Sequence, residues 1–234
     1  MNAEKKTEFE QNLRNLNLMI ARLGGLAEAQ FARSVEALER RDSSDIQLII
    51  DNDRHLDALE FDINEKAVAL ISQTAPKARD LRRVIVALKI ASILERVGDY
   101  AKNMAKRSLV IIEHEQHKSD NISLARMAGI VQQMLNRVLD AYASADAIMA
   151  MEVWDRDMEV DQLHTSLFFE IMSGISDNPA QVSASSHMLF IAKNIERIGD
   201  YATGIAEQIY FLQHGALPSD ERPKADKSSM SALG

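Results

Sequence analysis

A seven-residue block that occurs twice limits the possible folds of this chain more than any other property of its sequence. Residues 95–101 read ERVGDYA and residues 196–202 read ERIGDYA, so the blocks differ only at Val97 and Ile198. The two blocks stand 101 positions apart, because 196 − 95 = 101. Since chance is a poor explanation for such a match, we interpret the chain as two copies of one unit.

The repeat extends upstream of the blocks. Residues 56–59 match residues 160–163 at an offset of 104 positions, three more than the offset of the blocks. The difference in length therefore falls in the segments that contain Pro76 and Pro179, where a helix should be broken. A length difference confined to a loop is typical of a structural repeat.

The composition favours helices over strands. The chain of 234 residues is 46% hydrophobic but only 5% aromatic, and Ala, Leu, Ile and Met are abundant. The spacing of apolar residues divides each copy into three helices. We expect helices over residues 7–40, 43–72, 77–113, 121–150, 151–174 and 180–213.

The sequence thus predicts an all-α protein of two tandem three-helix bundles that are related by internal duplication. The first repeat should span residues 1–116 and the second residues 117–214, with a polar bridge at 114–121. Residues 215–234 are rich in Pro, Ser, Asp and Lys without periodicity, so we expect a disordered tail. A single six-helix bundle or a solenoid is the alternative architecture.

Charge and hydropathy narrow the classes of partner and compartment. The net charge is −8 and the pI is about 5.3, so nucleic acid is not expected as a partner. The N-terminus lacks the apolar core of a signal peptide, and no apolar run approaches the roughly 18 residues of a membrane span. Cysteine is absent, which excludes disulfides and thiolate metal sites. We expect a cytoplasmic protein.

Each block carries a Glu and an Asp four residues apart, and side chains at that spacing share one face of a helix. These pairs are Glu95 with Asp99 and Glu196 with Asp200. In both copies the acids continue the apolar stripe of the helix instead of occupying a plainly solvated face. Adjacent carboxylates beside apolar surface repel each other, so they stay ionised only if a cation or water compensates.

The preceding helix of each copy supplies a second acidic pair. Asp53 and Asp57 are four residues apart, and so are Asp157 and Asp161. If the two helices pack antiparallel, the pairs can face each other and offer four carboxylates per copy. Oxygen-rich sites of this kind suit Mg²⁺, Mn²⁺, Ca²⁺ or ferric iron better than zinc or copper.

A glycine lies between the two acids of each block, at Gly98 and Gly199. A glycine in mid-helix costs about 1 kcal/mol relative to alanine, so its use in both copies indicates a purpose. The missing side chain should let a neighbouring helix or a ligand approach.

A solvated helix face is the competing interpretation of these acids. A single Glu-x-x-x-Asp on a helix is usually paired with a basic residue three or four positions away. Arg96 and Lys102 are available as such partners in the first copy. Repeats also share residues by descent, so both interpretations stay open on the sequence alone.

Positive charge is concentrated in one segment of the first copy. Residues 77–107 hold nine basic residues against three acidic ones, whereas residues 178–208 hold two against three. Such an excess suits an acidic protein partner, an anion or a membrane surface, and the alternative is charge that complements the acidic second helix. The candidate partner-binding residues are Arg79, Arg82, Arg83, Arg96 and Arg197.

Catalytic motifs are not found. The sequence has no Gly-rich phosphate loop, no HExxH and no GxSxG. Asp161 and His164 form a DxxH, but Glu60 stands at the position of the first copy that matches His164, so no paired ligand set follows. We therefore assign no catalytic residue and do not expect an enzyme. A phosphohydrolase with paired divalent ions is the alternative.

The doubled block, the preceding sequence PKARDLR at residues 76–82 and the two three-helix units resemble the PhoU family of phosphate-uptake regulators. The resemblance covers about residues 5–213. It implies paired three-helix bundles, similar to spectrin repeats, whose E(D)xxxD motifs bind metal ions. By position, it implies that the metal ligands are Glu95, Asp99, Glu196 and Asp200, with Asp53, Asp57, Asp157 and Asp161 on the facing helices.

The resemblance also implies a role. Members of the family look like cytoplasmic adaptors without established enzyme activity. They are linked to the ATPase PstB of the phosphate ABC transporter and to the sensor histidine kinase PhoR, and they repress the phosphate-starvation response. We accordingly expect a negative regulator that modulates phosphate transport and reaches the membrane only through its partners. Exposed stripes on the long helices separately lead us to expect a homodimer. The expected metal is Mg, Mn or Fe, and zinc suits the ligands less well.

Two departures from the family pattern distinguish the copies from other members and from each other. Many members have His after the motif Asp, whereas this chain has Tyr100 and Tyr201. The Pro-x-Ala-x-Asp-Leu-Arg loop is present in the first copy, but residues 179–184 of the second copy read PAQVSA. We therefore expect the two sites to differ in partners or affinity.

Overall fold

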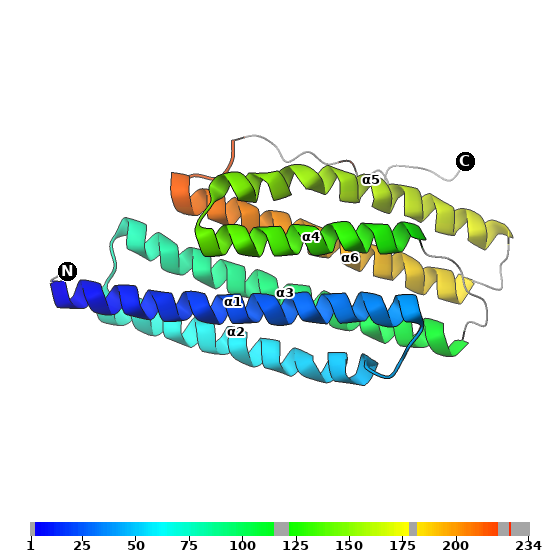
Figure 1. Cartoon of the computed structure of the whole chain (residues 1–234), viewed down its shortest axis with the longest axis horizontal. Helices are drawn as coiled ribbons and strands as arrows, with labels where there is room; N and C mark the ends of the chain where they lie inside the picture. The colour runs from blue at the N-terminus through cyan, green and yellow to red at the C-terminus, as the bar shows by residue number, and fades with distance from the viewer. Residues whose placement is uncertain (1–2, 115–121, 178–181, 220–224, 226–234) are drawn as a thin grey trace.

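The computed structural model describes residues 3–114, 122–177, 182–219 and 225, and this part of the chain folds into six α-helices without a strand (Figure 1). The helices are α1 (Ala3–Arg40), α2 (Ile46–Thr74), α3 (Ala78–His114), α4 (Ile122–Ser144), α5 (Ala147–Asp177) and α6 (Val182–His214). Apart from His114, the predicted bridge at 114–121 lies outside the described residues, as does most of the predicted tail. None of the described helices is both long enough and apolar enough to cross a membrane.

The six helices form two three-helix bundles that lie side by side along the long axis of the molecule (Figure 1). Helices α1, α2 and α3 pack against one another, and α5 and α4 pack against α6 and against each other. The bundles meet where α3 contacts α6 and where α1 contacts α4. The predicted all-α architecture of two three-helix bundles is therefore confirmed.

One hydrophobic core runs through both bundles. Along α1, the side chains of Phe9, Leu13, Leu16, Ile20 and Leu23 are fully buried at alternating spacings of four and three residues, which is the stripe of an amphipathic helix. Burying each such side chain contributes about 1.5–3 kcal/mol. Buried residues of all six helices belong to the same contiguous cluster, so the two copies share a core instead of being joined only by the chain.

One predicted helix boundary is wrong. The sequence placed the end of the fourth helix at residue 150, but the structure breaks the chain at Ala145, whose φ of 53° is left-handed. Asp146 then caps the start of α5, because its Oδ1 accepts hydrogen bonds from the N–H groups of Ile148 (2.9 Å) and Met149 (3.0 Å). The apolar pattern of the sequence continues across this cap, so the pattern alone does not reveal the boundary. The other predicted helix ends lie within a few residues of those observed.

Candidate functional site

The two repeated blocks face each other at the interface between the bundles. The rings of Tyr100 on α3 and Tyr201 on α6 lie 5.7 Å apart between centroids, with their planes tilted by 40°. Arg96 extends the contact, because its Nη1 donates a hydrogen bond of 3.4 Å to the Tyr201 hydroxyl. Tyr100 and Tyr201 therefore contact each other across the interface. They stand at the positions where the family resemblance leads us to expect histidine.

Gly98 admits a neighbouring helix, as the sequence predicted. A Cβ atom at this position would overlap Cδ2 of Leu56 on α2, and Leu56 is itself buried in the core. The equivalent Gly199 is less crowded, because a Cβ there would lie 3.5 Å from both Val131 and Val160, an ordinary van der Waals distance. Close helix packing thus favours glycine more strongly in the first block than in the second.

The first acid cluster joins α2 to α3 through a lysine. We define it as Asp53, Asp57, Glu60, Glu95 and Asp99. The Nζ of Lys102 forms ion pairs with Oδ2 of Asp53 on α2 and with Oδ1 of Asp99 on α3, the latter at 2.5 Å. The structure therefore brings the two predicted acidic pairs of the first copy together, with an ammonium group between them.

Gln30 of α1 completes the surroundings of Asp53. Its Nε2 donates to Oδ1 of Asp53 at 3.4 Å and to the carbonyl oxygen of Gly98 at 3.1 Å. Both carboxylate oxygens of the buried Asp53 therefore have a donor, one from Gln30 and one from Lys102. All three helices of the first bundle contribute to this site.

Mutual repulsion and burial shift the protonation of the first acid cluster. Burial, followed by the charges of Asp99 and Asp57, raises the pKa of Glu95 to about 7. Burial and the charge of Asp53 also raise the pKa of Asp57, although Lys102 opposes this shift. Burial would lower the pKa of Lys102, but its hydrogen bonds to Asp53 and Asp99 raise that pKa overall. The ammonium group therefore stays charged while Glu95 is easily protonated.

The second acid cluster lies between α5 and α6 and is more deeply buried. We define it as Asp157, Asp161, Glu196 and Asp200; the first three have exposed fractions of 1%, 2% and 4%, and His164 beside them is 4% exposed. Oε2 of Glu196 is buried without a hydrogen-bond partner. Burial raises the pKa of Glu196 against the opposing effect of Lys193, whose Nζ lies 2.9 Å from Oε1.

Two further contacts reach the second acid cluster. Nη1 of Arg197 lies 3.4 Å from Oδ2 of Asp200 on the same helix. The backbone N–H of Ala225, in the segment after α6, donates to Oδ2 of Asp161 at 2.8 Å. A backbone donor from beyond the last helix therefore stabilises one of the predicted ligands.

The offsets of the repeat show how the two clusters differ. At the offset of 101 positions, Thr203 corresponds to Lys102, and its hydroxyl donates to the carbonyl oxygen of Asp200 at 2.7 Å. At the offset of 104 positions, His164 corresponds to Glu60. The second copy thus exchanges a carboxylate and an ammonium group for an imidazole and a hydroxyl. Sequence reasoning considered Lys102 only as a partner of Asp99 and missed its contact with α2.

The fit of a metal ion differs between the clusters. In the described part of the chain, no three Asp, Glu or His side chains are placed so that they could hold a metal ion. The first acid cluster does not fit such an ion as it stands, because Lys102 already lies between its two pairs. The second has buried carboxylates and one imidazole, and Oε2 of Glu196 has no hydrogen-bond partner, although Nε of Arg197 lies 3.9 Å from it. These are donor types that suit a hard cation.

The basic residues fall into two groups. Arg79, Arg82 and Arg83 line an open cavity of about 780 Å³ where the start of α1, the start of α3, the α4–α5 turn and the end of α6 meet. Arg83 makes two hydrogen bonds to Glu10 of α1, at 2.7 and 3.0 Å. Arg82 lies over the ring of Phe211 on α6, with Cζ 5.2 Å from the centroid. Arg96 and Arg197 lie instead beside the tyrosine contact.

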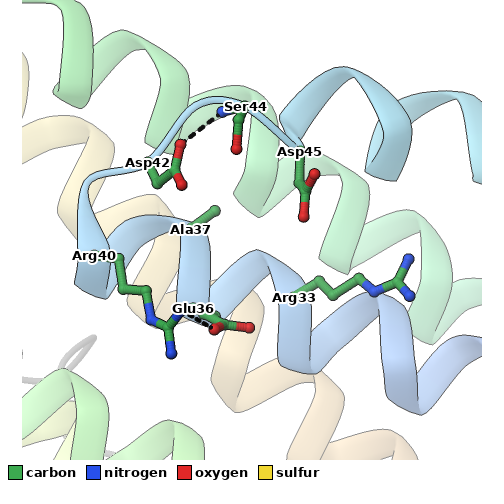
Figure 2. Close-up of a pocket in the computed structure, with 7 residues that line it drawn as sticks. All are labelled: Arg33, Glu36, Ala37, Arg40, Asp42, Ser44 and Asp45. Carbon is green, nitrogen blue, oxygen red and sulfur yellow. Dashed lines mark hydrogen bonds and ion pairs between the residues drawn. The ribbon is translucent and has the colours of Figure 1, made fainter.

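A smaller cavity of about 80 Å³ at the α1–α2 turn does not form a comparable site (Figure 2). Three of its charged side chains have local partners: Arg40 contacts Glu36 at 2.8 Å, and Asp42 accepts a hydrogen bond of 2.9 Å from the N–H of Ser44. Its volume is well below the roughly 300 Å³ of the smallest ordinary ligand pockets. We assign it a role in closing the turn.

Comparison with known proteins agrees with this arrangement. A family model described as PhoU domain matches residues 20–108 and 124–209, once in each copy. The phosphate-specific transport system accessory protein PhoU homolog of Caulobacter vibrioides is 42% identical over 218 residues, which cover 93% of this chain and 95% of the relative. The homolog of the same description from Rhizobium meliloti is 42% identical over 221 residues, covering 94% and 93%.

Solved structures have the same fold. The crystal structure of PhoU from Pseudomonas aeruginosa superposes with a TM-score of 0.86 at 30% identity, covering 89% of this chain and 100% of that one. The phosphate transport system regulatory protein PhoU of Streptococcus pneumoniae superposes with a TM-score of 0.84 at 27% identity, covering 90% and 99%. Sequence, duplication and fold agree over nearly the whole length, and the chain therefore belongs to the PhoU family.

Proposed function

We propose that this chain is a regulatory accessory protein of a phosphate-specific transport system. The observation that carries the proposal is the near full-length similarity to proteins named for that system, at 42% identity over 93% of the chain. The residues around the blocks are part of this similarity, since the matched segments include both acid clusters. A regulator of this kind acts by contact with other proteins, so the proposal depends on surfaces that partners can bind.

The finer proposal is an adaptor between the transporter ATPase PstB and the sensor kinase PhoR, acting as a negative regulator of the phosphate-starvation response. The cavity lined by Arg79, Arg82 and Arg83 supports it. Arg83 is already neutralised by Glu10, whereas Lys6, Arg79 and Arg82 carry positive charge into the cavity beside only one other acid, Asp80. An acidic segment of a partner would complement this end of the bundle.

The second acid cluster is the place where we propose a bound metal ion, Mg, Mn or Fe in preference to Zn. Its donors are carboxylate oxygens and one imidazole, and its buried Glu196 has an oxygen without a hydrogen-bond partner. A cation there would relieve the repulsion between Glu196 and Asp200 and would offset the burial of Asp157 and Asp161. The expected homodimer stays a prediction, which the solution mass from light scattering tests.

An affinity pull-down tests the adaptor proposal. The full chain is used as bait in extracts of phosphate-replete and phosphate-starved cells, and bound proteins are identified by mass spectrometry. We expect the transporter ATPase and the sensor kinase to be recovered, and the double variant Arg79→Glu, Arg82→Glu to lose at least one of them. Arg22→Glu, an exposed change on α1, is the matched control. Recovery of neither partner under both conditions would refute the adaptor role.

A further inference from the structure

We propose that Lys102 is the resident cation of the first acid cluster and keeps metal ions out of it, so that only the second acid cluster can bind one. The part that concerns the second acid cluster rests on the function proposed above. The part that concerns Lys102 does not, because it follows from contacts within the first bundle.

The first argument is the position of the Lys102 ammonium group. A metal that joined α2 to α3 through Asp53 and Asp99 would have to bind oxygens of both residues. Nζ of Lys102 already contacts Oδ2 of Asp53 and lies 2.5 Å from Oδ1 of Asp99. A metal ion and an ammonium group repel each other, so they cannot share this place between the helices.

The second argument is the burial and hydrogen bonding of Asp53. Its side chain is 8% exposed, and Gln30 holds the oxygen that Lys102 does not contact. Gln30 is itself fixed by its second hydrogen bond, to the carbonyl oxygen of Gly98. A metal would therefore have to displace donors from α1 and α3, and the donor from α1, Gln30, is anchored to the backbone of α3.

The second copy lacks each part of this arrangement. Thr203 stands in place of Lys102 and donates to the backbone of its own helix. Val131 approaches Gly199 where Gln30 approaches Gly98, so the amide is replaced by an apolar side chain. Lys193 and Arg197 contact Glu196 and Asp200 from α6 itself. The exchange of Glu60 for His164 removes one acid and the exchange of Lys102 for Thr203 removes one base, while Lys193 adds a base where the first copy has Ser92.

The test measures Mn²⁺ binding by the full chain. Metal is first removed with a chelator, and free Mn²⁺ is then followed by electron paramagnetic resonance during titration. We expect Lys102→Thr and Lys102→Gln to bind one more equivalent of Mn²⁺ than the unchanged chain. The gained equivalent should disappear when Asp99→Asn is added. Lys106→Thr, which removes an exposed lysine four residues further along α3, should gain nothing.

The reciprocal change separates the two parts of the inference. Thr203→Lys should remove the equivalent that the unchanged chain binds. If the unchanged chain binds no Mn²⁺ but Lys102→Thr binds one equivalent, the metal function proposed for the second acid cluster is refuted while the role of Lys102 stands. If Lys102→Thr binds no more Mn²⁺ than the unchanged chain, the role of Lys102 is refuted.

One variant decides the matter without any change at residue 102, in case the Lys102 variants lose helicity. Asp99→Asn in the otherwise unchanged chain should leave the number of bound Mn²⁺ ions as it was. Loss of an equivalent would mean that the first acid cluster holds a metal with Lys102 in place, which overturns the proposal.

Discussion

The two glycines of the repeated block should respond oppositely to the same substitution. Gly98→Ala and Gly199→Ala each replace a mid-helix glycine, which by itself gains about 1 kcal/mol of helix stability. The new methyl group of Gly98→Ala must displace the buried Leu56, whereas that of Gly199→Ala fits at ordinary distances of 3.5 Å. Overpacking of a well-filled core costs about 1–3 kcal/mol. Gly199→Ala should therefore stabilise the chain by about 1 kcal/mol, and Gly98→Ala should destabilise it by up to about 2 kcal/mol.

Thermal and urea denaturation of both variants and the unchanged chain measure this difference. For a chain of this size, 1 kcal/mol corresponds to about 2–4 °C in Tm, so the two variants should differ by roughly 2–12 °C. The second copy supplies a rescue variant, because Val160 stands where the first copy has Leu56. Leu56→Val should remove the clashing Cδ2 and recover much of the cost of Gly98→Ala. Equal Tm values for Gly98→Ala and Gly199→Ala would refute the packing argument.

Three further predictions concern single residues. Ala145→Gly should raise the free energy of unfolding by about 0.5–1 kcal/mol, because glycine adopts the left-handed φ of 53° without strain. Asp146→Ala should lower it by about 1 kcal/mol through loss of the α5 cap. Both follow from urea denaturation. Because the pKa of Glu95 rises from 4.5 to about 7 on folding, the folded chain holds its proton longer, and stability should fall as pH rises from about 4.5 to 7. Glu95→Gln should flatten this fall, while Glu113→Gln at an exposed site should not.

The outcomes that contradict these predictions are distinct. An Ala145→Gly variant less stable than the unchanged chain would contradict the first prediction. It would show that the extra conformational entropy of glycine in the unfolded state outweighs the relief of backbone strain at residue 145. Unchanged stability in Asp146→Ala would mean that the cap hydrogen bonds are replaced by water. An unaltered slope of stability against pH in Glu95→Gln would show that the raised pKa belongs to another carboxyl group of the first acid cluster.

The duplication and the apolar periodicity were sufficient to predict the fold. Nearly identical blocks 101 positions apart indicated two equivalent units, and the burial of Phe9, Leu13 and Leu16 follows the spacing by which the helices were recognised. The break at Ala145 could not be predicted in this way, because alanine has no preference for a left-handed φ and the apolar pattern continues across it. That boundary depends on the hydrogen bonds that Asp146 accepts. In the sequence alone, Asp146 cannot be distinguished from any other aspartate.

The acids of the candidate site were found from the sequence, but the group between them was not. The spacing of Asp99 and Lys102 showed only a pair on one helix. The contact of Lys102 with Asp53 joins residues 49 positions apart, and that of Gln30 with Gly98 joins residues 68 apart. Such contacts depend on how three helices pack, which no local pattern specifies. Comparing the two copies at Lys102 and Thr203 was the signal available in the sequence.

The contacts between the bundles have a consequence for how the halves of this chain can diverge. Equivalent helices meet equivalent helices, since α3 contacts α6 and α1 contacts α4, and Tyr100 meets its counterpart Tyr201. This is the self-complementary contact that two identical subunits make about a two-fold axis. In a homodimer every substitution would appear on both sides of that axis. Fusion into one chain removes this constraint, so a lysine can close one acid cluster while the other keeps its threonine. The two halves of the chain therefore meet as the subunits of a symmetric dimer do, but each half can change its residues independently, as the subunits of a heterodimer can.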